Sequence, residues 1–427
     1  MTLWAARAAS AERAVHARHL RRLWQLPGTL LGVVAWPAGL RQRLWLGLWH
    51  YWWQAHLLDC LLDAYLREPS PPRRAAVERL ARGVRVRNLR RGWVNDFYDD
   101  VAWFGLALQR ASQAGIRHDG ALAAIRERLH NGWSDAGGGG IWWCVGSDFK
   151  NAPTNGPAAI LLARSGNERD FGLALRVAEW IEQRLVDPDS GLVWDGVRVD
   201  PGGPVSTSQP AAGSSSLPAP DSTTRPAPDS PMRPTAGSSS RPAAGSSSRP
   251  AAESSSRLAA VHTVERATYT YCQGVYLGAC VELALATGAT VWTRRAHRTI
   301  AAVSAAMTGG DGVLRTHGGG DGGLFTGILA RYLALAALLL PGGSQPDRIA
   351  RQTAADLVLT SATAVWRNRA VVTGGPLFGA GWSVPATPPA AGGVKRDRAE
   401  RDLSVQLSGW MLCEAAALIE RRRPELL

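Results

Sequence analysis

Residues 93–108 read WVNDFYDDVAWFGLAL, and this stretch shows how the chain folds. Its first part mixes polar and aromatic residues, as in a loop that leads into a helix. From Val101 onward, Phe104 and Leu108 recur after three and four residues, which is the spacing of one face of an α-helix. The other positions are also largely apolar, so other elements must cover the helix on most sides. The stretch therefore predicts a buried helix, near residues 96–113, that starts beside acidic residues.

Helices of this kind recur along the chain, and no stretch alternates convincingly as a strand. Helices are expected near residues 10–24, 48–67, 73–88, 96–113, 119–130, 152–164, 169–186, 269–287, 292–307, 323–340, 347–365 and 403–423. Every second helix is apolar and follows a glycine- or aromatic-rich loop, whereas those between carry Arg and Glu on one face. This alternation predicts an all-α fold, an (α/α)6 barrel of six helical hairpins whose inner helices begin at one rim. An α-solenoid is the rival architecture, but its repeats should resemble one another, and these do not.

Residues 201–257 stand apart because they consist largely of Pro, Ser, Ala and Gly, with RPTAGSSS, RPAAGSSS and RPAAESSS in succession. A segment with so few large apolar side chains cannot offset the entropy of being ordered, so it is expected to be disordered. Ordinary helical sequence flanks it on both sides. We therefore interpret it as an insertion into a single domain, residues 1–427, rather than as a linker between two domains.

The composition argues against several classes of protein. The net charge of +13 would suit nucleic acid or an anionic membrane surface, but the charge is almost all arginine, scattered over many segments without interleaved aromatic residues. The apolar run 333–340 is far shorter than the roughly 18 residues that span a bilayer, so it predicts a buried helix and no membrane insertion. Five cysteines without a CxxC pair predict buried, reduced thiols, and no metal or cofactor is expected. The N-terminus lacks the apolar core of a secretory signal, which predicts a cytoplasmic location.

Tryptophan is the unusual residue in this composition. There are 18 Trp against six Phe and seven Tyr, whereas core building normally draws more evenly on the three. Indole faces stack well on the apolar faces of sugar rings. The alternative is that tryptophans fill the core, and we expect this of about half of them.

Asp99 and Asp100 are the strongest candidates for chemistry. Two adjacent carboxylates at the start of a buried helix raise one pKa, which leaves one group protonated and one ionised near neutral pH. Cleavage of a glycosidic bond requires such a pair, an acid and a nucleophile. Trp93, Phe97 and Trp103 surround the pair with aromatic surface, as expected of a desolvated cleft. The alternative is that both acids cap the helix N-terminus, where carboxylates are favoured.

The candidate sugar-contacting residues are aromatic, amide or charged side chains near the starts of the predicted inner helices. They are Trp52, Trp53, Gln54, Asn95, Tyr98, Trp103, Trp142, Trp143, Lys150, Asn151, Asn155, Tyr271, Gln273 and Asp321. Lys150 is informative because the chain has only one other lysine, so we expect that a compact donor is required there. Structural amides remain the alternative for Gln54 and Gln273, and a helix cap for Asp321. For Asp59 and Asp63 a structural role is favoured.

Five motifs in order, WWQAHLLDCLLDAY, NDFYDDVAWFGLAL, GGIWWCVGSDFKNAPTN, TYTYCQGVYLGA and GGDGGLFTGIL, resemble glycoside hydrolase family 76, the endo-α-1,6-mannanases. The resemblance runs from about Trp49 to Ala417. It implies an (α/α)6 barrel that hydrolyses α-1,6-linked mannan with retention, with Asp99 as nucleophile and Asp100 as acid/base. Retention requires carboxyl groups about 5 Å apart, which adjacent residues can supply. The chain departs from the family pattern at Gly156, where many members carry an acid.

Other functions remain open at this stage. A non-catalytic sugar-binding protein on the same scaffold would use the same aromatic surfaces, although the intact acid pair argues against it. An (α/α)6 sugar epimerase would be expected to place histidines in the cleft, and the rim segments contain few. An oligosaccharide or polysaccharide is the expected partner. The sequence does not determine the oligomeric state.

Overall fold

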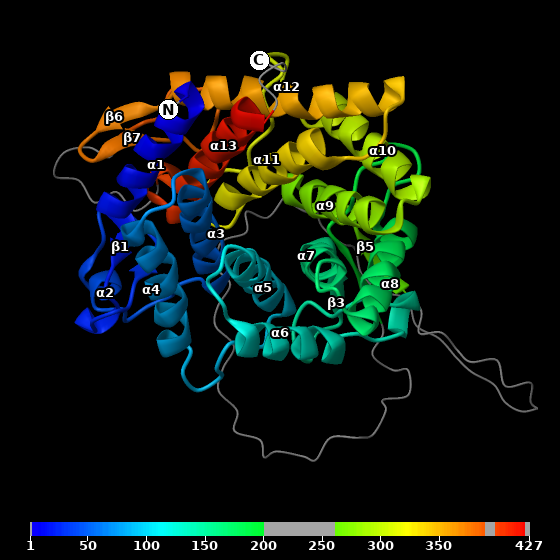
Figure 1. The fold of residues 1–427 in the computed structure, drawn as a ribbon, viewed down its shortest axis with the longest axis horizontal. Coiled ribbons are helices and arrows are strands. Elements are labelled where there is room, and N and C mark those ends of the chain that lie inside the picture. Colours follow the sequence, from blue (N-terminus) through cyan, green and yellow to red (C-terminus); the bar gives the residue numbers. More distant parts are fainter. Residues whose placement is uncertain (1, 200–260, 389–397, 423–427) are drawn as a thin grey trace, which may run out of the picture. The chain divides into compact units, whose positions relative to one another are not determined.

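The protein is described by a computed structural model that covers residues 2–199, 261–388 and 398–422, and it is the expected all-α (α/α)6 barrel. The inner helices are α3 (Tyr51–Arg67), α5 (Tyr98–Gln113), α7 (Ala152–Ala163), α9 (Thr270–Thr287), α11 (Gly322–Leu339) and α13 (Leu403–Arg422). The outer helices are α4 (Pro71–Arg87), α6 (Asp119–Asn131), α8 (Glu168–Leu185), α10 (Thr290–Ala306), α12 (Gln345–Arg367) and α1 (Leu3–His19). Each inner helix contacts the next, and α13 contacts α3, which closes the ring (Figure 1).

Helix α1 is the outer partner of the last inner helix, α13, so segments from the two ends of the chain form one hairpin. The expected bounds of this helix, residues 10–24, were wrong. The helix begins at Leu3 and ends at His19, because Leu20 is extended and pairs with Gly32 in a short ribbon. The four-residue helix α2 (Leu40–Arg43) was not predicted either.

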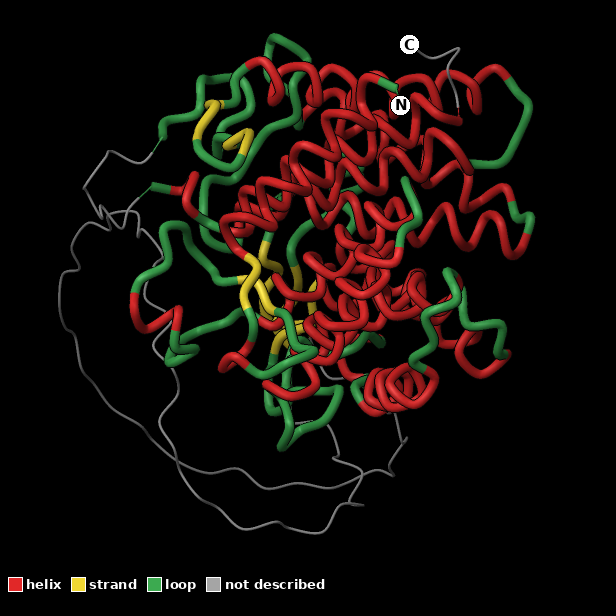
Figure 2. Tube along the Cα trace, turned by 60° about the vertical axis from the view of Figure 1, so that its left-hand side comes forward, coloured by secondary structure: helices red, strands yellow, loops and turns green. Residues whose placement is uncertain are grey.

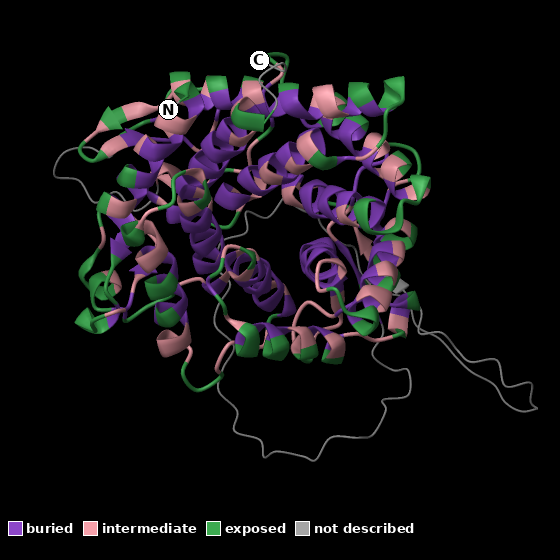
Figure 3. Cartoon of the chain, viewed as in Figure 1, coloured by how far each residue is buried: buried purple, intermediate pink, exposed green. Residues whose placement is uncertain are grey.

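Burial follows the alternation that the sequence shows. Inner helices are buried along most of their length, whereas outer helices expose one face (Figure 3). Local signals explain where several helices begin. Ser344 and Asp347 form a reciprocal capping box at the start of α12, and the side chain of Asn167 accepts backbone N–H groups at the start of α8.

The expectation that the chain contains no strand was also wrong. The described residues contain β1 (Leu20–Arg21), β2 (Leu31–Gly32), β3 (Phe149–Asn151), β4 (Gly196–Val199), β5 (Val261–Glu265), β6 (Ala370–Val372) and β7 (Gly375–Leu377). All pair antiparallel in the loops between helices (Figure 2). Strands of two to five residues are too short to show alternation in the sequence.

Strands β4 and β5 flank residues 200–260 and pair with each other, Val199 with Val261, so the described residues on either side of that segment are neighbours in one sheet. The predicted disordered insertion, residues 201–257, lies outside the described residues. The single-domain assignment therefore stays a prediction. The cytoplasmic location, which was predicted from the N-terminus, also stays a prediction.

An ion-pair cluster joins three inner helices away from the rim where they begin. Asp59 and Asp63 of α3 pair with Arg110 of α5 and Arg331 of α11. Asp63 lies 2.6 Å from each of the two arginines. These contacts give both aspartates the structural role that was favoured from the sequence.

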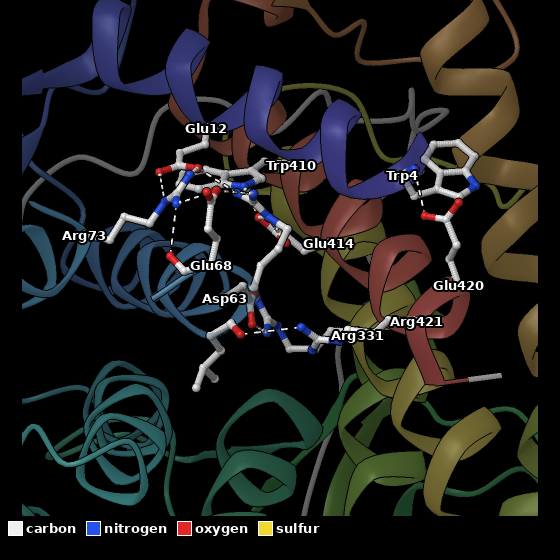
Figure 4. Close-up of polar contacts among 12 residues, drawn as sticks. Trp4, Glu12, Asp63, Glu68, Arg73, Arg331, Trp410, Glu414, Glu420 and Arg421 are labelled. Carbon is white, nitrogen blue, oxygen red and sulfur yellow. Dashed lines mark hydrogen bonds and ion pairs between the residues drawn. The ribbon is translucent and has the colours of Figure 1, made fainter. Parts of the chain in front are cut away.

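A second cluster lies beside the first and links α1, α3 and α13 (Figure 4). Arg67 binds Glu12 at 2.6 Å and Glu414 at 3.0 Å, and Arg73 binds Glu12 at 2.8 Å. The indole of Trp410 donates to Glu414 at 2.9 Å. A cavity of about 580 Å³ opens among the C-terminal parts of α3, α5, α11 and α13, lined in part by these charged groups.

One helix among the described residues, α11, is long and apolar enough to cross a membrane. It packs between α9 and α13 as an inner helix, so its apolar composition is that of the core. Residues 333–340 fall almost entirely within it, in line with the buried helix predicted there. Four of the five free cysteines are buried, and Cys144 is half-buried.

Gly83 of α4 marks a close approach that the fold requires. A Cβ atom there would lie 2.1 Å from the carbonyl oxygen of Leu30, whose N–H donates to Arg79 at 3.0 Å. Gly83→Ala is therefore expected to lower the free energy of unfolding by about 2 kcal/mol or more. Urea denaturation measures this. The matched control is Gly172→Ala in α8, where nothing lies within 4 Å and the helix should gain up to about 1 kcal/mol. Equal stability of the two variants would contradict the close approach.

Candidate active site

The acid pair lies in the first turn of α5, at the rim where the inner helices begin. Two backbone hydrogen bonds position this helix start. The N–H of Tyr98 donates to the carbonyl of Trp143 at 2.9 Å, and the N–H of Trp143 donates to the carbonyl of Phe149 at 2.8 Å. The loop before α7 therefore determines where α5 begins, and with it the position of the two carboxyl groups.

The two carboxyl groups have different hydrogen-bond donors. Asp99 accepts the backbone N–H of Asp100 at 2.8 Å and the indole N–H of Trp143 at 3.0 Å. Asp100 accepts the side-chain amide of Asn95 at 2.6 Å. Asn95 in turn accepts the backbone N–H of Phe97 at 3.0 Å, which fixes its orientation. Asn95 is thus a positioning residue for Asp100.

Burial raises the pKa of both carboxyl groups and is the largest cause for each. At Asp100 the adjacent charge of Asp99 raises the pKa further, and the amide of Asn95 only partly lowers it. At Asp99 the two N–H donors lower the pKa and favour the ionised form. We infer that near neutral pH the pair holds one proton, which resides on Asp100.

Aromatic side chains from three inner helices meet beside the acids. Tyr271 of α9 stacks on Phe325 of α11, with ring centroids 3.8 Å apart and planes 8° apart. Trp52 of α3 lies 6.4 Å from the same Phe325 ring. Trp52 and Tyr271 are half-buried, as are Trp142 and Trp143, and all four therefore keep surface that a ligand could contact.

Asp321 precedes α11 and belongs to the same rim. It accepts the indole N–H of Trp53 at 2.8 Å, and its own side chain is 58% exposed. Its charge raises the pKa of both Asp99 and Asp100, which shows that its field reaches them. Trp53 itself is 3% exposed and stacks on His50 at 4.3 Å, so it supports Asp321 from below rather than facing the solvent.

The expectation that Lys150 contacts the sugar was wrong. Its side chain has no exposed surface, and its ammonium group donates to the carbonyls of Ser134, Ala136 and Gly139 at 2.6–2.7 Å. It also lies 4.3 Å above the Trp142 ring. Burial lowers its pKa, whereas three carbonyl acceptors and an indole face favour the charged form. Lys150 therefore holds the glycine-rich loop together from inside.

Three candidate amides are also fully buried and do not reach the rim surface. Gln54 pairs with both backbone groups of Gly32, and Gln273 does the same with Val193. Asn155 likewise pairs with both backbone groups of Ile141. Side-chain amides match a backbone N–H and carbonyl together, which is why they fix loops here.

Tyr98, Trp103 and Asn151 are buried as well. The ring of Tyr98 lies under the guanidinium group of Arg128 of α6, at 4.7 Å, so it packs on the outer side of its hairpin. Trp103 packs against His56 at 4.7 Å inside the ring. Asn151 caps α7 by accepting the N–H of Thr154. These three predicted contacts with the sugar are replaced by structural roles.

Phe325 and His50 were not among the site residues predicted from the sequence. Phe325 belongs to the motif GGDGGLF, and its position next to the candidate Asp321 was the available signal. His50 adopts a left-handed backbone conformation with a φ of 46°, and no residue type or spacing predicts this. His317, near Phe325, accepts the N–H of Thr270 at 3.3 Å, which occupies one of its ring nitrogens.

Gly156 stands where many members of the resembling family carry an acid. A Cβ atom at this position would lie 2.4 Å from a side-chain atom of Val275, because α7 and α9 approach closely here. The present packing therefore leaves no room for a side chain at position 156. Within the described ranges, no three His, Cys, Asp or Glu side chains are grouped so that they could hold a metal ion.

The family model of glycosyl hydrolase family 76 matches residues 7–209 and 253–394. The chain belongs to glycosyl hydrolase family 76. No curated protein sequence matches it significantly. Among solved structures, the GH76A α-1,6-mannanase from Salegentibacter sp. HEL1_6 is 28% identical to this family member, with a TM-score of 0.72 over 98% of this chain and 100% of that chain. An inactive variant of that enzyme, with two consecutive aspartates replaced by asparagine, has been solved in complex with α-1,6-mannotriose.

More distant structures share the fold. The Lin0763 protein from Listeria innocua is 24% identical, with a TM-score of 0.70 over 98% of each chain. Dfg5 from Chaetomium thermophilum, solved in complex with glucosamine, is 14% identical, with a TM-score of 0.66 over 98% of this chain and 91% of that chain.

The raised pKa of Asp99 makes stability depend on pH. An aspartate in the unfolded chain has a pKa of about 4, and folding raises the pKa of Asp99 above this value. At a pH between the two pKa values, only the folded chain keeps the proton of Asp99. Its contribution to stability is therefore present at low pH and is lost as the pH rises through the folded-state pKa. Asp99→Asn cannot ionise, so we expect it to melt at a higher temperature than wild type at pH 8, with a smaller difference at pH 4.

Calorimetry at both pH values measures this difference. Asp96→Asn is the control, because Asp96 is about half exposed and pairs with Arg91. A variant at Asp99 that melts below wild type at pH 8 would show that its carboxylate stabilises the fold.

Proposed function

We propose that this family member hydrolyses α-1,6-linked mannan, or a related mannose-containing glycan, with retention of configuration. The observation that carries the proposal is a pair of adjacent buried carboxyl groups with unlike surroundings, one favoured as carboxylate and one as acid. The 28% identical α-1,6-mannanase, whose variant at two consecutive aspartates is inactive, supports both the substrate and the pair.

The proposed reaction has two displacements. In the first, a carboxylate oxygen of Asp99 attacks the anomeric carbon while Asp100 gives its proton to the glycosidic oxygen. The bond to the leaving chain breaks, and a mannosyl ester of Asp99 forms. In the second, Asp100 takes a proton from water, whose oxygen attacks the anomeric carbon and releases Asp99. The product keeps the α configuration because each step inverts it.

The surroundings of each acid suit its role. Two N–H donors favour the ionised form of Asp99 against the effect of burial and hold its carboxylate in one orientation. Asp100 carries the proton because burial and the charge of Asp99 raise its pKa. The half-buried faces of Trp52, Trp143 and Tyr271 would stack on mannose units to either side of the cleaved bond.

The proposal predicts that Asp99→Asn and Asp100→Asn each lower kcat by about 10³-fold or more. The substrate is α-1,6-mannotetraose, and NMR follows product size and the anomer released first. Asp96→Asn is the matched control, three residues from Asp99, and should keep wild-type activity. Full activity in either variant would refute the assignment of that residue. Binding without cleavage by wild type would make the chain a sugar-binding relative, and a β-anomer as first product would exclude retention.

A second prediction concerns Asn95. Its amide donates to Asp100 and so stabilises the carboxylate, which lowers the pKa of that group. Asn95→Ala should therefore raise the pKa of Asp100 and move the alkaline limb of the kcat profile to higher pH. A variant that was only less stable would lose activity without this shift. An unmoved alkaline limb would exclude Asp100 as the acid.

A further inference from the structure

Exposed apolar side chains are concentrated in one short part of the described chain. Of the sixteen large apolar residues that are exposed, six lie within residues 24–48. They are Trp24 (47% exposed), Leu26 (41%), Leu40 (71%), Leu44 (50%), Leu46 (60%) and Leu48 (75%). We call them the leucine face. Single exposed apolar residues are ordinary on a soluble protein, but a contiguous group marks an interaction site.

Specific contacts hold the leucine face against the barrel. Trp45 is 6% exposed and its indole N–H donates to the carbonyl of Arg22 at 3.0 Å, which joins the α2 segment to the segment that carries Trp24. The guanidinium group of Arg87, in α4, lies 5.6 Å from the ring centres of both Trp24 and Trp49. The segments at α2, β1 and the end of α4 therefore form one surface, in the corner where Figure 1 labels α2 and Figure 3 shows exposed residues.

The same surface is strongly cationic. The sequence contains no Asp or Glu between Glu12 and Asp59, and none between Glu78 and Asp96. These two stretches carry six exposed arginines, Arg21, Arg22, Arg41, Arg43, Arg90 and Arg91, of which Arg41 and Arg43 lie between the leucines of the leucine face in the sequence. Among the described residues, only Arg91 of these six forms an ion pair, with Asp96. In the sequence the positive charge is scattered, but the contacts of Arg87 with Trp24 and Trp49 join the two acid-free stretches that carry these arginines.

This combination favours one class of partner. A second copy of the chain would set arginines against arginines across a two-fold axis, which is repulsive. Nucleic acid would use the arginines but would leave four leucines without an apolar partner. At an anionic bilayer, leucines enter the acyl boundary while arginines stay at the headgroups, so both features are satisfied.

We propose that the leucine face docks this protein peripherally on an anionic lipid bilayer. Leu40, Leu44, Leu46 and Leu48 would enter the interface, and Arg41 and Arg43 would bind lipid phosphates. No helix crosses the bilayer in this arrangement.

Docking here would place the catalytic rim next to the membrane. Leu48 precedes Trp52 by four residues, so their Cα atoms lie within about 14 Å of each other. A backbone hydrogen bond from Trp52 lowers the pKa of Asp100, so Trp52 reaches the acid pair directly. A glycan anchored in the bilayer would then present its chain to the rim. This substrate class, a membrane-anchored mannan, rests on the proposed function, whereas lipid docking does not.

Vesicle co-sedimentation of the full chain tests the docking. Wild type should bind vesicles of equal parts phosphatidylglycerol and phosphatidylcholine, bind phosphatidylcholine alone much more weakly, and bind less as salt increases. Arg41→Gln with Arg43→Gln should weaken binding about 25-fold, since each charge near the surface contributes about fivefold. Leu44→Ser, Leu46→Ser and Leu48→Ser together should lower it by at least tenfold.

The matched control replaces equally exposed residues elsewhere, Ile349→Ser, Val371→Ser and Val384→Ser, and should bind like wild type. The arginine, leucine and control surface variants should all hydrolyse a short soluble mannan oligosaccharide at the wild-type rate, which also reports correct folding. Asp100→Asn should still bind vesicles, so loss of hydrolysis and loss of docking are separate results.

Three results would overturn docking. The first is vesicle binding that the leucine variant leaves unchanged. The second is a wild-type dimer that the leucine variant converts to a monomer, which would assign the face to a second copy. The third is tight binding of RNA, without vesicle binding, that depends on the arginines alone. If docking holds and a lipid-linked α-1,6-mannoside is cleaved no faster on vesicles than in detergent, the membrane-anchored substrate class is excluded.

Discussion

The arrangement of the site depends on one constraint. Two carboxyl groups on consecutive residues are buried together at the start of α5. Burying charge is costly unless the charge is paired or hydrogen-bonded. The chain meets this requirement with N–H donors from Trp143 and Asn95, and both donors lie on loops. The loops must therefore hold these two donors in place.

The fully buried polar residues that were expected to touch sugar supply this rigidity. Lys150 binds three carbonyls of the glycine-rich loop, and Asn155 binds both backbone groups of Ile141, two residues before Trp143. By holding this loop, Lys150 and Asn155 position Trp143, whose indole N–H donates to Asp99. At the other end of the inner helices, the charges of Asp59 and Asp63 are compensated by two arginines, and this ion-pair cluster joins α3, α5 and α11.

The surplus of tryptophan has a second explanation beside sugar stacking. Nine of the 18 tryptophans lie within 5.6 Å of an arginine guanidinium group that covers the ring: Trp4, Trp24, Trp36, Trp49, Trp93, Trp133, Trp194, Trp292 and Trp366. Arginine is the more suitable cation for this contact because its planar group stacks on the indole. An arginine-rich chain can therefore pack its tryptophans against arginines, and only a few indoles remain for the rim.

By itself, the sequence determined the helices, their alternation between inner and outer positions, and the adjacency of Asp99 and Asp100, because periodicity and adjacency are local properties of a chain. Only the tertiary structure decided what each polar side chain contacts. Gln54 and Gln273 look like ligands of the rim in sequence, yet they bind backbone groups 22 and 80 residues away. The same holds for the aromatic rings, since Trp24 and Trp49 share one cation only because both segments fold against Arg87 of α4. Burial and electrostatic fields depend on distances in space, and these arise when segments that are remote in the chain come together.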